Sequence, residues 1–290
     1  MKTCRFLLLN ALLAISACAC AQENPFLAKA DVLYDLENGS TLTVTQASRS
    51  DGVYGEIQTE LFDSPQAISF VRFKPGRYSI TVVSAEEEMA DSTSALCLKN
   101  QAIAGINGSY FNMRNLTNVT YVKDDGVVTG TTTKGELFRT NGAIVFDSDL
   151  FSIYPVDSSW VYDGWEAMAS GPVLIDEGVS LVYGEDRDGW KSFYNRRHPR
   201  SMVGYDADGY IWLVVVDGRV KESAAGMTIA EMTSLSEMMG LTDALNLDGG
   251  GSSTLWTLEG GVLNHPCDNH KFDNAGQRRV PNILAVKRER

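Results

Sequence analysis

The sequence predicts an α+β protein, with a β-rich mixed sheet core, a few flanking helices and a single domain. Runs of β-branched and aromatic residues bounded by Pro and Gly recur from about residue 55 onward, as is typical of strands. Only two segments show apolar residues at helical spacing. No internal repeat or low-complexity linker divides the 290 residues, and 44% of them are hydrophobic, enough for one large core.

Residues 1–21 predict an export signal. The basic "MKTCR" precedes "FLLLNALLAISA", an apolar run too short to be a good membrane span. "ACA" at 19–21 before Gln22 fits ordinary cleavage, while "ISAC" at 15–18 resembles a lipoprotein box that would leave Cys18 lipidated. Both readings predict export from a bacterial cytoplasm to the periplasm, the cell surface or the exterior, with a lipid at Cys18 as the only membrane attachment.

Residues 22–54 form a polar, weakly patterned N-terminal extension, and its "VLYDLENGSTLTVTQ" could hold a short helix or a strand. Strand signals follow in "GEIQTELF", "ISFVRF" and "YSITVVSA". The "PGR" at 75–77 predicts a hairpin between the last two strands. "YDADGY" at 205–210 lacks the spacing of an EF-hand calcium loop and predicts a hairpin turn.

Two helices are predicted. The first covers about residues 92–99 and is introduced by Asp91. The second begins at Thr228, because Glu231 three residues later completes a capping-box pattern, and it ends at Gly240. Its apolar face, with Ile229, Met232, Leu235 and Met239, predicts packing against the core.

Four apolar runs end in a polar residue followed closely by Gly. They stop at Asn107, Asp176, Asp217 and Asp248. Apolar runs of this length predict strands buried on both faces, and sheet proteins usually build their sites where such strands end. We therefore group Asn107, Asp217 and Asp248 as a candidate site. The alternative is that each residue only begins a turn, and it is equally strong for Asp176 and Asp217.

The run "NLDGGGSS" predicts a ligand-facing loop. Three consecutive glycines carry an entropic cost that a simple turn need not bear, and Gly lets a ligand approach the backbone. The amides of Gly249, Gly250 and Gly251 and the hydroxyls of Ser252 and Ser253 are candidate donors to an anion. The run lacks the Lys of a P-loop, the spacing of a dinucleotide fingerprint and the second Gly of a nucleophile elbow.

The net charge of −12, or −14 once Lys2 and Arg5 leave with the signal, argues against nucleic acid as a partner. A local basic patch remains in "NRRHPR", where we expect Arg196, Arg197 and His198 to lie in a solvated loop. Arg200 precedes a strand and is the candidate two-pronged phosphate contact. Arg278 and Arg279 form a second basic pair.

The cysteines and histidines predict neither a metal site nor a cofactor, although a divalent cation stays possible. Beyond the signal only Cys97 and Cys267 remain, without CxxC or metal-type spacing. A disulfide between them is allowed by the compartment but not required. Cys97 lies on the apolar side of the first helix, which favours a buried free thiol.

Six segments, in their order and spacing, resemble the phosphodiester glycosidase family over roughly residues 55–287, within a domain expected to span 55–290. They are "INGSYF", "SGPVLIDEG", "RSMVG", "VVVDGR", "GMTIAEM" and "NLDGGGSSTL". Two features depart from the family pattern. Ser109 and Tyr110 stand where Gly and Phe are common, and the stretch at 186–199 is longer than usual.

The resemblance implies a secreted hydrolase that cleaves a sugar-1-phosphodiester, such as phosphate-linked N-acetylglucosamine on a glycan, to a free sugar and a phosphomonoester. In this reading Asp248 is the nucleophile or base. Asp217 is its partner carboxylate or a structural orienter, and Asn107 holds sugar hydroxyls or the phosphate. Arg200 and the 249–253 loop contact the phosphate as its charge grows.

Two other classes of function remain open. One is a metal-assisted phosphodiesterase that uses Asp176, Asp217 and Asp248 as ligands. The three histidines argue against it, since none falls in a ligand motif: His198, His265 and His270. The other is a non-catalytic glycan-binding module on the cell surface.

Overall fold

The computed structural model describes residues 24–86, 89–147, 150–183 and 191–289. The predicted signal at 1–21, with Cys18, lies outside these residues. Across the part that is described, no helix is both long and apolar enough to span a membrane.

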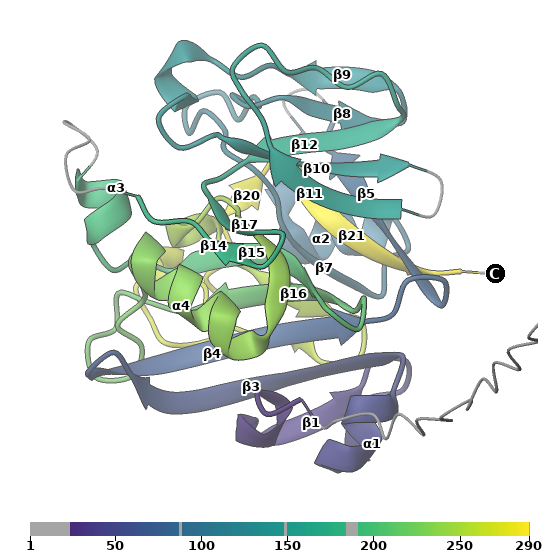
Figure 1. The fold of residues 1–290 in the computed structure, drawn as a ribbon, viewed down its shortest axis with the longest axis vertical. Helices are drawn as coiled ribbons and strands as arrows, with labels where there is room; N and C mark the ends of the chain where they lie inside the picture. Colours follow the sequence, from purple (N-terminus) through teal and green to yellow (C-terminus); the bar gives the residue numbers. More distant parts are fainter. Residues whose placement is uncertain (1–23, 87–88, 148–149, 184–190, 290) are drawn as a thin grey trace, which may run out of the picture.

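Three sheets dominate the molecule (Figure 1). The largest has nine strands in the order β14 (Val179–Ser180), β13 (Val173–Asp176), β17 (Leu241–Asn246), β15 (Arg200–Asp206), β16 (Ile211–Val216), β4 (Ser64–Phe73), β3 (Gly52–Leu61), β1 (Val32–Asp35) and β2 (Thr41–Leu42).

Two five-stranded sheets and a small pair complete the β structure. One five-stranded sheet has the order β11 (Leu150–Pro155), β10 (Gly142–Asp147), β12 (Glu166–Ser170), β8 (Val122–Asp124) and β9 (Val127–Gly130). The other has the order β19 (Gly261–Val262), β18 (Leu255–Thr257), β7 (Ala104–Asn107), β21 (Asn282–Arg288) and β5 (Tyr78–Ser84). β20 (Arg279–Val280) pairs with β6 (Asp91–Ser92).

The strands pair antiparallel throughout the described sheets, so the expectation of a mixed sheet is wrong. The apolar runs behind that expectation have another cause: both faces of the nine-stranded sheet are covered. Along β16, Leu213 and Val215 enter a core shared with the two five-stranded sheets, while Trp212, Val214 and Val216 enter a second core. The β-rich character and the burial on both faces are confirmed.

The second core is closed by helix α4 (Ile229–Met239), which lies across the nine-stranded sheet (Figure 1). The capping box is present as predicted: the Thr228 hydroxyl accepts from the Glu231 amide at 3.1 Å, and the Glu231 carboxylate accepts from the Thr228 amide at 2.9 Å. Gly240 ends the helix with φ 76°. Met232, Leu235 and Met239 are buried, as expected for core packing.

Helix α2 (Thr93–Lys99) packs against the sheet that contains β7 and β21. Its cap is Ser92 rather than Asp91, since the Ser92 hydroxyl accepts from the Ala95 amide at 3.2 Å. Cys97, a residue of this helix, is fully buried as a free thiol, which confirms the prediction. Cys267 is also buried and free.

The chain before residue 55 forms one edge of the nine-stranded sheet, with strands β1 and β2. Helix α1 (Val44–Arg49) follows them, so the segment "VLYDLENGSTLTVTQ" contains both strand and the start of a helix. The turn at 75–77 forms, but the predicted hairpin does not, because β4 and β5 belong to different sheets. The turn at 205–210 does join a hairpin, β15 to β16, and the Asp206 carboxylate accepts two of its amides.

Candidate active site

Two strand ends meet at one edge of the nine-stranded sheet. β16 and β17 both run antiparallel to β15 and flank its first residues, so Asp217 and Asp248 leave the sheet at the same edge. Asn107, at the end of β7, lies beside Asp248, because its Nδ2 donates to the Asp248 carbonyl. Asp176 lies at the opposite edge, because Ile175 pairs with Ala244 in an antiparallel register. The candidate group is thus brought together, and Asp176 is not part of it.

Asp248 follows the last buried residues of β17 and is held by its backbone. Its amide donates to the Gly108 carbonyl at 3.0 Å, and its carbonyl accepts from Asn107 Nδ2 at 2.7 Å. The carboxylate accepts the Gly249 amide at 3.0 Å. Burial raises the pKa of Asp248 above its usual range, against the opposing influence of the Ser252 hydroxyl and of the charges of Arg139 and Arg278.

The three glycines are required by close neighbours. A Cβ on Gly249 would meet the Pro199 carbonyl oxygen, and one on Gly251 would clash with the Asp268–Arg278 ion pair. Gly250 has φ 65°. The Gly249 and Gly250 amides already donate, to Asp248 Oδ1 and to the Pro199 carbonyl at 2.8 Å. Those two amides therefore do not serve as the phosphate donors that the sequence suggested.

The two serines after the glycines are almost fully buried. Neither Ser252 Oγ nor Ser253 Oγ forms a hydrogen bond of good geometry within the described chain. The Ser252 hydroxyl is nevertheless close enough to Asp248 to lower the pKa of that carboxyl. Because a buried hydroxyl without a partner is costly, these oxygens are suited to a ligand or a water.

Asn107 holds the backbone on both sides of the glycine run, at Asp248 and Thr254, rather than contacting a ligand. It is 1% exposed, and both ends of its amide are used within the chain. Its Oδ1 accepts from the Ser201 hydroxyl at 2.7 Å and from the Thr254 amide at 3.1 Å, while its Nδ2 binds the Asp248 carbonyl. The expectation that Asn107 holds the sugar or phosphate is therefore corrected, since its polar atoms are already satisfied.

Asp217 holds the C-terminal end of the 249–253 loop in place through Asn264. Its carboxylate is 1% exposed and accepts from Asn264 Nδ2 at 2.9 Å, from the His265 amide at 3.0 Å and from His265 Nδ1 at 2.8 Å. Asn264 in turn binds the Ser253 carbonyl and the Leu255 amide. This favours the structural orienter of the two predicted roles, and it withdraws Asp217 from the predicted set of metal ligands.

Arg200 binds backbone carbonyls next to the site, so its predicted role as a phosphate contact is corrected to a structural one. It is 2% exposed, its Nε donates to the Met227 carbonyl at 2.9 Å, and its Nη2 donates to the Phe193 carbonyl at 2.5 Å and the Arg196 carbonyl at 3.2 Å. Burial lowers the pKa of Arg200 to about 10. A guanidinium engaged in this way holds the chain around residues 193–200 in place.

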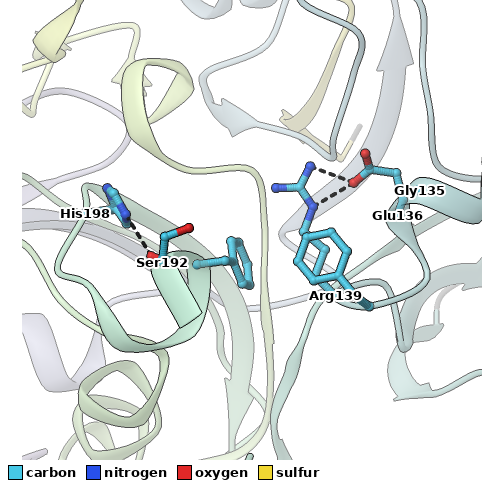
Figure 2. Close-up of a pocket in the computed structure, with 7 residues that line it drawn as sticks. Gly135, Glu136, Arg139, Ser192 and His198 are labelled. Carbon is cyan, nitrogen blue, oxygen red and sulfur yellow. Dashed lines mark hydrogen bonds and ion pairs between the residues drawn. The ribbon is translucent and has the colours of Figure 1, made fainter. Parts of the chain in front are cut away.

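Arg139 and Arg278 supply the charge near Asp248. The Arg139 guanidinium lies 3.6 Å from the ring centroid of Tyr110. It pairs with the Glu136 carboxylate at 2.6 Å (Figure 2). Arg278 forms two 2.7 Å bonds to the Asp268 carboxylate. Sequence reasoning noticed Arg278 in "QRRV" but missed Arg139, because no motif marks it and only the fold brings it to Asp248.

The other basic residues were only partly anticipated. Arg196 is exposed, as expected of a solvated loop. Arg197 instead forms an ion pair with Glu231 at 2.5 Å, and His198 is half-buried with Nε2 3.1 Å from the Ser192 carbonyl. Arg279 donates to the Ala90 carbonyl at 2.8 Å and has a structural role.

The residues that depart from the expected family pattern are satisfied inside the protein. The Ser109 hydroxyl donates to the Ala169 carbonyl at 2.6 Å. The Tyr110 hydroxyl donates to the Gly171 carbonyl at 2.5 Å and accepts from Asn246 at 3.1 Å. Both side chains are therefore hydrogen-bonded within the protein, and the Tyr110 ring lies against the Arg139 guanidinium.

Two proteins of the same name, from mouse and human, are similar to this chain in sequence. N-acetylglucosamine-1-phosphodiester alpha-N-acetylglucosaminidase from mouse is 30% identical over 125 residues, which cover 42% of this chain and 23% of the mouse protein. The human protein of the same name is 25% identical over 225 residues, which cover 76% of this chain and 37% of the human one. The chain thus spans well under half the length of these relatives.

A solved structure shares the fold. The catalytic domain of the zebrafish N-acetylglucosamine-1-phosphodiester alpha-N-acetylglucosaminidase, auto-inhibited by its pro-peptide, matches with a TM-score of 0.64 at 16% identity and 82% coverage of both chains. The phosphodiester glycosidase family model matches residues 100–287, which is more than half of the chain and contains Asp248 with its glycine run. The chain therefore belongs to the phosphodiester glycosidase family.

Proposed function

We propose that the protein is an exported hydrolase that cleaves a sugar-1-phosphodiester, such as one of N-acetylglucosamine, to a free sugar and a phosphomonoester. The observation that carries the proposal is the Asp248 carboxylate, half-buried after the end of a strand and influenced by two arginines, Arg139 and Arg278. Membership of the family supports the bond that is cleaved. A signal or lipid attachment before residue 22 remains part of the proposal.

Guanidinium groups lie around the 249–253 loop and suit an anionic substrate. Arg139 and Arg278 are close enough to Asp248 to lower the pKa of its carboxyl, and Arg219 lies beside Gly250. A phosphodiester carries a single negative charge, so these cationic groups favour its binding.

The reaction breaks the bond between the anomeric carbon and the phosphate oxygen. The phosphomonoester leaves with the bonding electrons, and the positive charge that develops on the sugar ring is stabilised by the Asp248 carboxylate. Asp248 then either bonds to the anomeric carbon until water displaces it, or removes the proton from the attacking water. Arg139 and Arg278 stabilise the charge that gathers on the departing phosphate.

The test is the Asp248→Asn variant assayed for both products. We expect turnover to fall by about a thousandfold or more, as is typical for loss of a catalytic carboxylate, with normal folding. Asp208→Asn, in the exposed turn between β15 and β16, is the matched control and should keep full activity. A variant that retains more than about a tenth of kcat, a loss under ~1.4 kcal/mol, would remove Asp248 from the chemistry.

Product identity separates the other classes of function. A free reducing sugar with a phosphomonoester supports the glycosidase. A sugar phosphate, formed by an activity that EDTA abolishes and a divalent cation restores, would indicate a metal-assisted phosphodiesterase. Binding of the diester without turnover by the wild type would indicate a glycan-binding module.

A further inference from the structure

His265 is fixed against the buried carboxylate of Asp217 by its backbone and its ring. Its amide donates to both carboxylate oxygens at 3.0 Å, and its Nδ1 lies 2.8 Å from Asp217 Oδ2. Because an ionised carboxylate only accepts, Nδ1 carries a proton whether the ring is charged or neutral. The ring also stacks on Phe272, with centroids 3.8 Å apart and planes 12° apart. These contacts hold the imidazole in one orientation on Asp217.

The contact joins two segments that each bring a charged group to the glycine run. Arg219, two residues after Asp217, lies beside the second glycine. Asp268, three residues after His265, binds Arg278 through two 2.7 Å bonds. The bond between Asp217 and His265 therefore ties together the segments that position both arginines.

A second connection reaches the 249–253 loop itself. Asn264, directly before the histidine, donates to Asp217 Oδ1 at 2.9 Å and to the Ser253 carbonyl at 3.1 Å. The neighbouring Ser252 hydroxyl is close enough to Asp248 to lower the pKa of that carboxyl. A shift of the Asp217 carboxylate would thus be transmitted to the part of the loop that contacts Asp248.

The surroundings of His265 favour its charged form. Burial opposes the charge, but the hydrogen bond and charge of Asp217, and next the charges of Glu56 and Asp273, raise the pKa of His265. These carboxylates come from three elements: the end of β16, strand β3 and the loop after residue 269. Since Asn264 and the backbone amide are neutral, the ring is the donor that can compensate the charge of the buried Asp217 carboxylate.

We propose that His265 is a positioning residue of the reaction: in its charged form it fixes Asp217, and thereby holds Arg219, Arg278 and the loop serines in their places. The proposal rests on the proposed function, because those groups surround the same substrate phosphate. Loss of the ring proton leaves the bond to Asp217 in place but removes its charge assistance. The loop is then held less firmly, and catalysis slows without a change in any group that touches the substrate.

The test is the pH dependence of kcat on a sugar-1-phosphodiester, for the wild type and for His265→Asn. The Asn amide nitrogen can take the place of Nδ1, but it carries no charge at any pH. We expect the wild-type kcat to fall about fivefold as the pH rises through the folded pKa of His265, which lies above 6.5, since a charge-assisted hydrogen bond is about twice as strong as a neutral one. His265→Asn should lack this fall and remain at the lower level from about pH 6 to pH 9.

Two further variants sharpen the test. His270→Asn is the matched control, because it makes the same substitution at an exposed histidine whose φ of 57° suits Asn, and it should keep the wild-type profile. Glu56→Gln removes one carboxylate near the ring without altering His265. It should move the midpoint of the fall to lower pH and leave the level before the fall unchanged.

The outcomes separate positioning from the reaction and from a purely structural role. A structural histidine would make His265→Asn slower by the same factor at every pH, so persistence of the fall in this variant would overturn the proposal. A flat wild-type profile would also overturn it. If His265→Asn does not fold, Glu56→Gln decides, and a midpoint that stays in place contradicts the role of His265. Failure of the wild type to cleave the diester at any pH would instead overturn the proposed function.

Discussion

Asp248 combines two demands that oppose each other. A carboxylate that stabilises a positive sugar ring works best away from water, yet burial disfavours its charge and raises its pKa. The protein partly offsets this cost with the Gly249 amide, the Ser252 hydroxyl and two arginines. None of these removes the penalty completely, because the pKa remains raised. Ionisation of this carboxylate therefore comes at the expense of stability.

This cost predicts how stability depends on pH. Since the folded state binds the Asp248 proton more tightly than the unfolded chain, the ionised group destabilises the fold above its folded pKa, and the penalty disappears below the unfolded value of about 3.9. Asp248→Asn should thus be more stable than the wild type at pH 7, by about 1.4 kcal/mol for each unit of pKa shift. Urea unfolding from pH 7 to pH 4 measures the difference, which should shrink as the pH falls. A variant of equal or lower stability at pH 7 contradicts the argument.

At the level of single elements, helix α4 and its partners show what can be read from local sequence. The capping box at Thr228 and Glu231 was predictable because its two residues stand three apart. The bond from Arg197 to the same Glu231 was not, since 34 residues separate them and no pattern joins them. The same holds for Arg139 and Asp248. They come close only because β10, which follows Arg139, and β17, which precedes Asp248, belong to sheets that share one core. Local signals located the strand ends, and tertiary contacts decided which side chains face the site.

Glu231 should therefore matter more than an ordinary helix cap. Its carboxylate accepts the Thr228 amide at 2.9 Å and binds Arg197 through both oxygens. Glu231→Ala removes cap and ion pair together and should cost about 2–3 kcal/mol, whereas Glu231→Gln keeps the cap and should cost about 1 kcal/mol. Urea unfolding measures both, with Glu222→Ala at an exposed position as the control. Equal losses for Ala and Gln would show that the cap contributes nothing.

At the scale of the whole molecule, three sheets contribute to one central core. The sequence showed where strands lie and that many are buried on both faces. It did not show which strands share a sheet: β4 and β5 follow each other across a short turn yet belong to different sheets. Pairing between distant strands leaves no local signal, which is why the mixed sheet and the hairpin at 75–77 were wrong. The positions of Asp217 and Asp248 on the same side of the nine-stranded sheet could be anticipated, because they depend only on where strands end.

A core of this extent predicts that the two cysteines contribute as buried thiols. Cys97 and Cys267 are both buried and unpaired, and burial raises the pKa of the Cys97 thiol, so little reactive thiolate forms. A protein without residues 1–21 should resist alkylation when folded and react at both cysteines in denaturant. Dithiothreitol should leave its Tm unchanged. A drop in Tm on reduction, with a mass two hydrogens higher, would instead reveal a disulfide.

The glycine run at 249–251 makes distant positions interdependent in evolution. Gly249 faces the Pro199 backbone, Gly250 faces Arg219, and Gly251 faces Asp268 and Arg278. A side chain at 251 becomes acceptable only if the Asp268–Arg278 pair changes at the same time, and single substitutions are rejected before such a double change can arise. Replacing any one of the three glycines alone should therefore strain this loop. A tolerated change at 251 calls for a matching change in the Asp268–Arg278 pair.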